Sequence, residues 1–300
     1  MRALVISGGG SKGAFAGGVA QFLIENKKKE YDLFLGTSTG SLLIPHLALG
    51  HIDKIYEIYS NVDMSKIFNI NPFIIKSKNG VDIVTINHFS VLRQLFRKKR
   101  TFGESKNLLK LIKSNFPIEE FNVLKVSNKD VVVTVTNISN NETEYKSIKD
   151  FSYDEFCEWI WISGNYIPFM SLVCKNDCEY ADGGFLNLVP IQEAINRGAT
   201  EIDVVILETE NNIVNKVTGK NPFSLLIDLM QITLEQVEKQ NIIIGKLMAR
   251  NKDIKLNLYY TPTKLTNNSL IFNREKMKEW WEAGYKYAQE KSNIMSENKQ

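Results

Sequence analysis

The chain has 300 residues, of which 43% are hydrophobic, and its 37 basic and 34 acidic side chains give a formal net charge of +3. This composition excludes a disordered or fibrous protein and supplies enough apolar residues for a sizeable core. No Pro/Gly/Ser-rich linker or internal repeat divides the sequence, so we predict one domain over residues 1–291 and a frayed polar tail over 292–300.

Strand and helix patterns alternate along the chain, which predicts a layered α/β fold. The predicted strands cover 2–7, 32–36, 130–138, 143–147, 170–174, 178–182, 202–208 and 254–260. The predicted helices cover 14–26, 40–50, 52–60, 88–98, 104–115, 153–163, 189–197, 222–250 and 273–291. The apolar run 202–207 is typical of a strand inside a parallel sheet. We therefore expect a central, mostly parallel sheet flanked by helices, with a helical cap segment over 64–102.

The first strand leads into a glycine cluster, Gly8-Gly9-Gly10-Ser11-Lys12-Gly13. A glycine loop that feeds a helix N-terminus offers free backbone N–H groups at the positive end of the helix dipole, which suits a developing oxyanion. The candidate oxyanion-hole residues are Gly8, Gly9, Gly10 and Gly13. The same glycines match the dinucleotide fingerprint G-x-G-x-x-G. That site needs an acid at the end of the second strand, whereas Asp32 opens that strand.

The second strand ends in Gly36-Thr37-Ser38-Thr39-Gly40. G-x-S-x-G directly after a strand is the pattern of a nucleophile elbow, in which a sharp turn exposes a serine hydroxyl above a sheet. Gly36 and Gly40 permit the close backbone approaches that such a turn requires. An ordinary strand-to-helix turn matches the same five positions by chance, but the position between an apolar strand and a helix favours the elbow. Ser38 is therefore the candidate nucleophile.

A serine hydroxyl needs a neighbouring base to become a good nucleophile. The chain has three histidines, His46, His51 and His88. An ordinary α/β-hydrolase places its histidine late in the chain, after the serine and the acid, so we do not expect a Ser-His-Asp triad. Asp182 is the remaining candidate, because Gly183 and Gly184 after it predict a turn with little steric bulk around the carboxylate. The alternative is that Asp182 only starts a turn, as most Asp-Gly pairs do.

These three blocks, in this order, resemble the patatin-like phospholipases, which are acyl hydrolases with a Ser-Asp dyad. The stretch Ser163–Pro168 is more loosely similar to a segment that the family carries before its aspartate, and the resemblance covers about residues 1–207. Two positions depart from the family pattern. Ser7 stands where many members have an acid, and Asn165 stands where members usually have a small residue.

The resemblance implies that Ser38 is the nucleophile, that Asp182 is the base, and that the Gly9 and Gly10 region forms the oxyanion hole. It implies no metal and no organic cofactor. The expected reaction is hydrolysis of the acyl esters of phospholipid, lysophospholipid or other lipids. The alternative is a protein with the same fold that binds lipid or docks on a membrane without hydrolysis.

Basic residues concentrate near the middle of the chain, at Arg93, Arg97, Lys98, Lys99 and Arg100. Apolar neighbours such as Leu92 and Phe96 make this cluster suitable for an anionic membrane surface. A solvated helix end, with basic residues near its C-terminal dipole, explains the cluster equally well. The segment 64–102 is also unusually apolar, which fits either a lid or acyl-pocket wall or a cap packed on the core. No motif indicates nucleic-acid binding.

Charged residues interrupt the apolar helix 222–250, so we expect it to flank the core rather than to span a membrane. The odd cysteine count, Cys157, Cys174 and Cys178, predicts free thiols in a reducing compartment. Met1 leads directly into the strand before the glycine loop, so we expect no secretory signal. We therefore expect a cytoplasmic protein, with peripheral membrane contact as an option. The sequence does not specify an oligomeric state.

Overall fold

The computed structural model describes residues 1–78, 81–210, 222–266 and 268–297. Its main sheet has eight strands in the order β10-β9-β1-β2-β5-β8-β7, and β6 also pairs with β5. The strands are β1 (Arg2–Ile6), β2 (Leu33–Thr37), β5 (Asp130–Asn137), β6 (Glu142–Ser147), β7 (Val173–Lys175), β8 (Cys178–Asp182), β9 (Glu201–Ile206) and β10 (Lys255–Tyr260). Strands β10, β9, β1, β2 and β5 run parallel, whereas β6, β7 and β8 pair antiparallel. The prediction of a central, mostly parallel sheet is confirmed.

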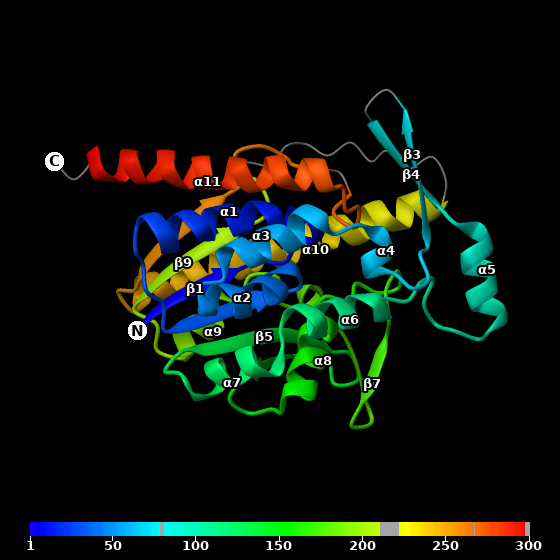
Figure 1. Ribbon diagram of the computed structural model, residues 1–300, viewed down its shortest axis with the longest axis horizontal. Coiled ribbons are helices and arrows are strands. Elements are labelled where there is room, and N and C mark those ends of the chain that lie inside the picture. The colour runs from blue at the N-terminus through cyan, green and yellow to red at the C-terminus, as the bar shows by residue number, and fades with distance from the viewer. Residues whose placement is uncertain (79–80, 211–221, 267, 298–300) are drawn as a thin grey trace.

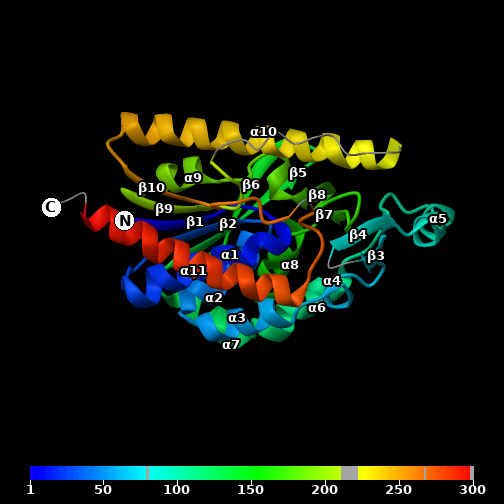
Figure 2. The same ribbon diagram turned by 90° about the horizontal axis from the view of Figure 1, so that it is seen from above.

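Helices cover both faces of this sheet (Figures 1 and 2). They are α1 (Gly13–Gln21), α2 (Thr39–Leu49), α3 (Ile52–Asn61), α4 (Met64–Ile67), α5 (His88–Phe96), α6 (Lys106–Asn115), α7 (Ile118–Val126), α8 (Tyr153–Ser163), α9 (Ile191–Asn196), α10 (Pro222–Asn251) and α11 (Arg274–Glu297). One core lies between the sheet and the layer that contains α1, α2, α8 and α11, and a smaller core lies under α9 and α10. No helix of the described residues combines the length and apolarity needed to cross a membrane.

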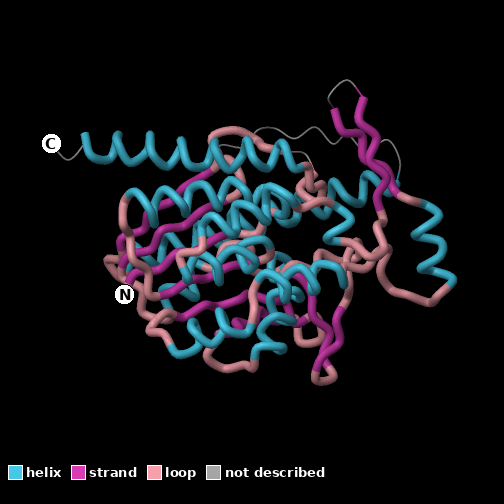
Figure 3. The backbone as a smooth tube through the Cα atoms, in the orientation of Figure 1, coloured by secondary structure: helices cyan, strands magenta, loops and turns pink. Residues whose placement is uncertain are grey.

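The segment 64–102 does not form the helical cap that we expected. Between α4 and α5 the chain forms an antiparallel hairpin, β3 (Phe73–Lys78) with β4 (Val81–Ile86). Both strands are rich in β-branched residues, which favour extended backbone over helix. The hairpin and α5 stand out together at one end of the molecule (Figures 1 and 3).

Three other elements differ from the expectation. Helix α7 was not predicted, although Glu119 and Glu120 in its first turn favour a helix N-terminus. The predicted helix 14–26 ends as α-helix at Gln21 and continues as one π-helical turn, Phe22–Asn26. Helix α11 continues to Glu297, so residues 292–297 are helical rather than a frayed tail, and residues 298–300 lie outside the described residues.

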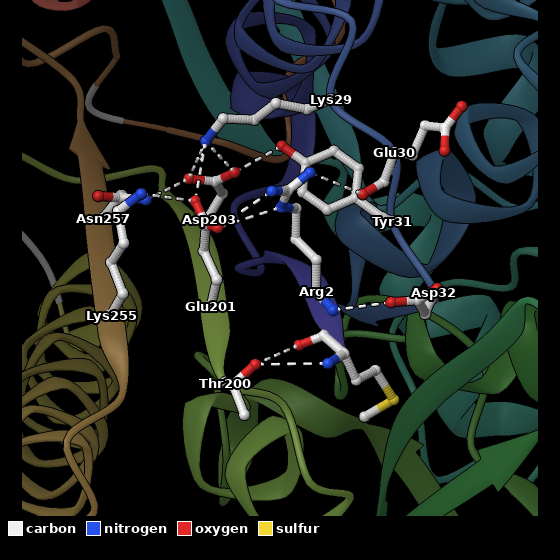
Figure 4. A network of polar contacts seen from close by, with 11 residues as sticks. Arg2, Lys29, Glu30, Tyr31, Asp32, Thr200, Glu201, Asp203, Lys255 and Asn257 are labelled. Carbon is white, nitrogen blue, oxygen red and sulfur yellow. Dashed lines mark hydrogen bonds and ion pairs between the residues drawn. The ribbon is translucent and has the colours of Figure 1, made fainter.

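A polar network joins the amino-terminal ends of the strands (Figure 4). Asp203 on β9 is fully buried, and its carboxylate accepts hydrogen bonds from Lys29 Nζ at 2.8 and 2.6 Å and from the Tyr31 hydroxyl at 2.7 Å. Asn257 on β10 donates to the same carboxylate at 2.8 Å. Burial of the Tyr31 hydroxyl, with Asp203 beside it, raises the pKa of Tyr31 well above its usual value. The network therefore ties β9 and β10 to the loop before β2.

We predict that Asp203→Ala lowers the free energy of unfolding by about 3 kcal/mol, because it leaves the buried Tyr31 hydroxyl without its acceptor and leaves Lys29 with only Glu201, at 3.8 Å, as an ion-pair partner among the described residues. Asn257→Ala, which removes a neutral donor, should cost about 1 kcal/mol. Urea unfolding of the two variants measures both values. A loss for Asp203→Ala no larger than that for Asn257→Ala would contradict the central role of this carboxylate.

Candidate active site

Ser38 lies in a strained turn between β2 and α2. Its backbone has φ 55° and ψ −120°, and a positive φ is rare outside glycine. This conformation is the nucleophile elbow that G-x-S-x-G predicts. Gly40 permits the turn, because a Cβ at residue 40 would lie 2.3 Å from the carbonyl oxygen of Ile6 on β1. The Ser38 side chain is nearly buried, with 8% of the residue exposed.

The sheet register brings Asp182 to this turn. On β5, Thr134 pairs with Thr37 of β2, while Val135 pairs with Asp182 at the end of β8. Ser38, which directly follows β2, and Asp182, which ends β8, therefore reach the same edge of the sheet, where both side chains line one cavity and Ser38 is close enough to lower the pKa of Asp182. The backbone N–H of Gly184 donates a hydrogen bond to Asp182 Oδ1 at 2.8 Å.

The Asp182 carboxyl group is almost fully buried, with 4% of the residue exposed. Burial disfavours its ionised form and raises the pKa of Asp182 to about 7, although Ser38 and the hydrogen bond from Gly184 act in the opposite direction. A carboxyl group with a pKa near neutrality is a much better proton acceptor than an ordinary aspartate. Asp182 therefore has the position and the basicity to take the proton of Ser38.

The glycine loop leaves only part of its backbone free to bind an oxyanion. The N–H of Gly8 donates to the carbonyl oxygen of Leu188 at 3.1 Å, and the N–H of Gly13 donates within the loop. Gly8 and Gly13 are therefore not available as oxyanion donors in this conformation, contrary to expectation. The N–H groups of Gly9 and Gly10 form no hydrogen bond with any described residue. Gly10 has φ +56°, and a Cβ there would lie 2.2 Å from the Ser269 carbonyl oxygen.

The histidines lie away from the dyad. His46 is buried in α2, where burial lowers its pKa to about 3, and it lines a separate apolar cavity. His51 lies 3.3 Å from Glu120, and His88 is exposed at the start of α5. None of the three is among the described residues that line the cavity at Ser38. A histidine base is therefore not present at this serine.

Two residues of the stretch Ser163–Pro168 hold the site together. The Ser163 hydroxyl accepts a hydrogen bond from the Ser38 N–H at 2.9 Å and donates to the Thr134 carbonyl at 2.6 Å. The Asn165 carbonyl accepts from the Asp182 N–H at 3.0 Å. The stretch that resembles the family only loosely therefore contains the residues that bind the backbones of Ser38 and Asp182. In the sequence, only the place of this stretch before Asp182 indicated such a role. The Asn165 side chain accepts a hydrogen bond from the Ser105 hydroxyl. The asparagine at this position, where family members usually have a small residue, therefore does not disturb Ser38 or Asp182.

Ser38, Asp182 and the glycine loop open into a cavity of about 140 Å³. Much of its wall is apolar or aromatic, for example Leu42, Ile67, Phe73, Tyr166, Phe169 and Phe272. A second, apolar cavity of about 50 Å³ shares Leu42, Ile67, Leu108 and Phe272 with the first. The two cavities therefore lie on either side of a shared apolar wall.

Cys157, Cys174 and Cys178 are free thiols. Burial raises the pKa of Cys157 to about 11, so this thiol is not a reactive nucleophile at neutral pH. Among the described residues, no three His, Cys, Asp or Glu side chains are arranged to hold a metal ion.

Comparisons with known proteins identify the family and the fold. Residues 4–195 match the family model described as patatin-like phospholipase. The chain is 41% identical over 66 residues to the uncharacterized protein L620 of Acanthamoeba polyphaga mimivirus, a match that covers 20% of this chain and 18% of that protein. The fold is similar to the crystal structure of VipD from Legionella pneumophila, with a TM-score of 0.52 and 17% identity, covering 96% of this chain and 66% of that chain.

The chain therefore spans less than two thirds of either protein, and the likeness to VipD concerns the fold. The family model covers well over half of the chain, and it includes the glycine loop, Ser38 and Asp182. The chain belongs to the patatin-like phospholipase family.

Proposed function

We propose that the protein is a serine acyl hydrolase that cleaves lipid esters with Ser38 as nucleophile and Asp182 as base. The observation that carries this proposal is the position of Ser38, in its strained turn, beside the buried carboxyl group of Asp182, whose pKa is raised to about 7. The strained elbow and the apolar cavity beside it support the same assignment. Free thiols suit a reducing compartment, so a cytoplasmic location is part of the proposal.

In the proposed reaction, Asp182 takes the hydroxyl proton as Ser38 Oγ bonds to the ester carbonyl carbon. The N–H groups of Gly9 and Gly10 stabilise the resulting oxyanion. The carbon–oxygen bond to the alcohol then breaks, and the alcohol leaves with the proton from Asp182. A water molecule loses a proton to Asp182 and attacks the acyl-serine, which releases the fatty acid and restores both residues. One carboxyl group thus acts in turn as base and acid.

The apolar lining of the cavity supports a lipid substrate, either phospholipid or lysophospholipid. Apolar and aromatic side chains favour an acyl chain, because burying each methylene group contributes about 0.8 kcal/mol. A non-hydrolytic lipid-binding protein is the alternative from another class. A fluorophosphonate probe separates the two, because it labels only an activated serine.

We expect Ser38→Ala to lower kcat/KM for a p-nitrophenyl ester by about 10⁴–10⁶-fold, as losses of catalytic residues elsewhere do. The fold should persist, since the variant loses one hydroxyl group. Circular dichroism and urea unfolding check the fold, and the fluorophosphonate probe should label only the parent protein. Unchanged hydrolysis by the purified variant would remove Ser38 from the mechanism.

The pH dependence of kcat/KM should report the ionisation of Asp182. Below pH 7 the carboxyl group is protonated and cannot accept a proton, so the rate should rise about tenfold per pH unit and level off above about pH 7. Asp182→Asn should be nearly inactive at every pH. Joint replacement of His46, His51 and His88 by glutamine should leave the profile unchanged in a folded protein. A folded but inactive histidine variant would show that the dyad is incomplete.

Helix α5 supports a further part of the proposal, which is contact with an anionic membrane. Phe89 is 79% exposed and Phe96 is 86% exposed on this projecting helix, values unusual for aromatic residues (Figure 1). Lys99 and Arg100 pair with Glu104 and Glu179. Arg93, Arg97 and Lys98 form no ion pair with any described residue, so they are the cations available to anionic lipid.

Replacing Arg93, Arg97 and Lys98 by glutamine should weaken binding to anionic vesicles about 100-fold, since each basic residue near such a surface contributes about 1 kcal/mol. Hydrolysis of a soluble ester should not change. A control that removes three exposed lysines elsewhere, Lys28, Lys278 and Lys286, has the same net charge. Vesicle sedimentation at low salt compares the two. Equal loss of binding in both variants would mean that net charge, and not α5, governs the contact.

A further inference from the structure

Tyr59, on α3, is a buried polar residue outside the dyad and the glycine loop. Only 5% of it is exposed, and its hydroxyl oxygen lies 2.5 Å from Thr39 Oγ1. The same hydroxyl donates a hydrogen bond to the Thr39 carbonyl oxygen at 3.3 Å. Burial raises the pKa of Tyr59 above its usual value, so the hydroxyl keeps its proton at neutral pH. One tyrosine therefore binds both the side chain and the backbone of Thr39.

Thr39 directly follows Ser38 and is the first residue of α2. A strained backbone such as that of Ser38 persists only where the surrounding structure holds it in place. On the amino-terminal side of the elbow, the Ser38 N–H donates a hydrogen bond to Ser163 Oγ at 2.9 Å. On the carboxyl-terminal side, Tyr59 holds Thr39. The elbow is therefore fixed from two directions, and Tyr59 supplies one of them.

The contact between Thr39 and Tyr59 also lies against the end of the glycine loop. Gly13 begins α1, and a Cβ at this position would lie 2.2 Å from Thr39 Oγ1 and 3.0 Å from the Tyr59 hydroxyl oxygen. Gly9 and Gly10, which carry the free N–H groups, lie only three to four residues before this point. A movement of Thr39 would therefore move the elbow relative to the loop that carries these N–H groups.

Tyr59 can reach the reaction only through another residue. It is not among the described residues that line the catalytic cavity, whereas Thr39 is. Tyr59 lines the second, apolar cavity, and its ring contacts Trp281 of α11, with the ring centroids 6.3 Å apart. These contacts hold the tyrosine from the side opposite the substrate. Any effect of Tyr59 on the rate must therefore come from where it places Thr39 and the elbow.

We propose that Tyr59 is a positioning residue for the reaction and that its hydroxyl, through Thr39, fixes the nucleophile elbow against the glycine loop. This inference rests on the proposed function and adds a residue to its machinery. Tyr59 neither takes nor gives a proton in the reaction. Its loss should slow the attack of Ser38, because the serine oxygen and the oxyanion donors must lie at the correct distance from the same carbonyl group. Binding of the substrate should change little.

Tyr59→Phe tests the proposal, because it removes the hydroxyl and keeps the ring. With a p-nitrophenyl ester, kcat should fall about tenfold to 100-fold, as small misplacements of reacting groups do, while KM changes less than about threefold. The rate of reaction with the fluorophosphonate probe should fall with kcat, since the probe also forms its bond at Ser38. Tyr56→Phe is the matched control, because Tyr56 also lies on α3 and contacts Trp281, with the ring centroids 5.3 Å apart. Its rates should equal those of the parent protein.

Substitutions at Thr39 test the same contact from the other side. Thr39→Ser keeps the hydroxyl and should keep kcat within about threefold of the parent value, whereas Thr39→Val keeps the shape and should show the loss. Tyr59→Phe combined with Thr39→Val should lose little more than the larger single loss, because both changes remove one contact. Circular dichroism and urea unfolding check the fold of each variant. Thr39→Val carries the test if Tyr59→Phe does not fold.

The role is overturned if folded Tyr59→Phe reacts within about twofold of Tyr56→Phe, or if the two single losses multiply in the double variant. A rise in KM at constant kcat would also overturn it, because this result would indicate weaker substrate binding rather than a misplaced elbow. Failure of the proposed function gives a different result. In that case the parent protein itself would neither hydrolyse the ester nor react with the probe.

Discussion

The site depends on the position of one strand, β5. It pairs with β2 on one side and with β8 on the other; Ser38 directly follows β2, and Asp182 ends β8. The carbonyl of Thr134 on β5 also accepts the hydrogen bond from Ser163, whose hydroxyl in turn binds the backbone of the elbow. Two residues 144 positions apart in sequence therefore meet because both strands share one neighbour, and a shift of register by one residue would separate them.

Burial has opposite effects on the two members of this pair. It accompanies the close packing of the elbow, where a Cβ at Gly40 would lie 2.3 Å from the carbonyl oxygen of Ile6 on β1. It also disfavours the ionised form of Asp182, and Ser38 and the hydrogen bond from Gly184 restore part of that loss. The balance leaves a carboxyl group that ionises near neutral pH. In the proposed mechanism, this carboxylate takes the proton of the serine directly, without a histidine between them.

Sequence analysis predicted the parts of the site that depend on local backbone geometry. The elbow at Ser38, the glycine loop and the turn after Asp182 each require residue types that leave a short motif. Features that depend on distant contacts left no such signal. The availability of the Gly8 N–H depends on Leu188, and the place of Tyr59 beside the elbow depends on how α3 packs against α1 and α2. The error over 64–102 has a different cause: we expected a helical cap there, whereas β-branched residues favour the hairpin that precedes α5.

Strand β9 has a structural polar network at one end and a polar residue of the cavity wall at the other. Asp203, near its start, belongs to the network that ties the strands together, and Glu208, just after its end, belongs to the cavity wall. In open α/β sheets ligands bind beyond the carboxyl ends of the strands, which leaves the opposite ends free of chemistry. Substitutions at the Asp203 end can therefore change the lifetime and abundance of the folded protein while its reaction stays the same. Homologous chains are free to adapt to temperature at one end of the sheet and to new lipids at the other.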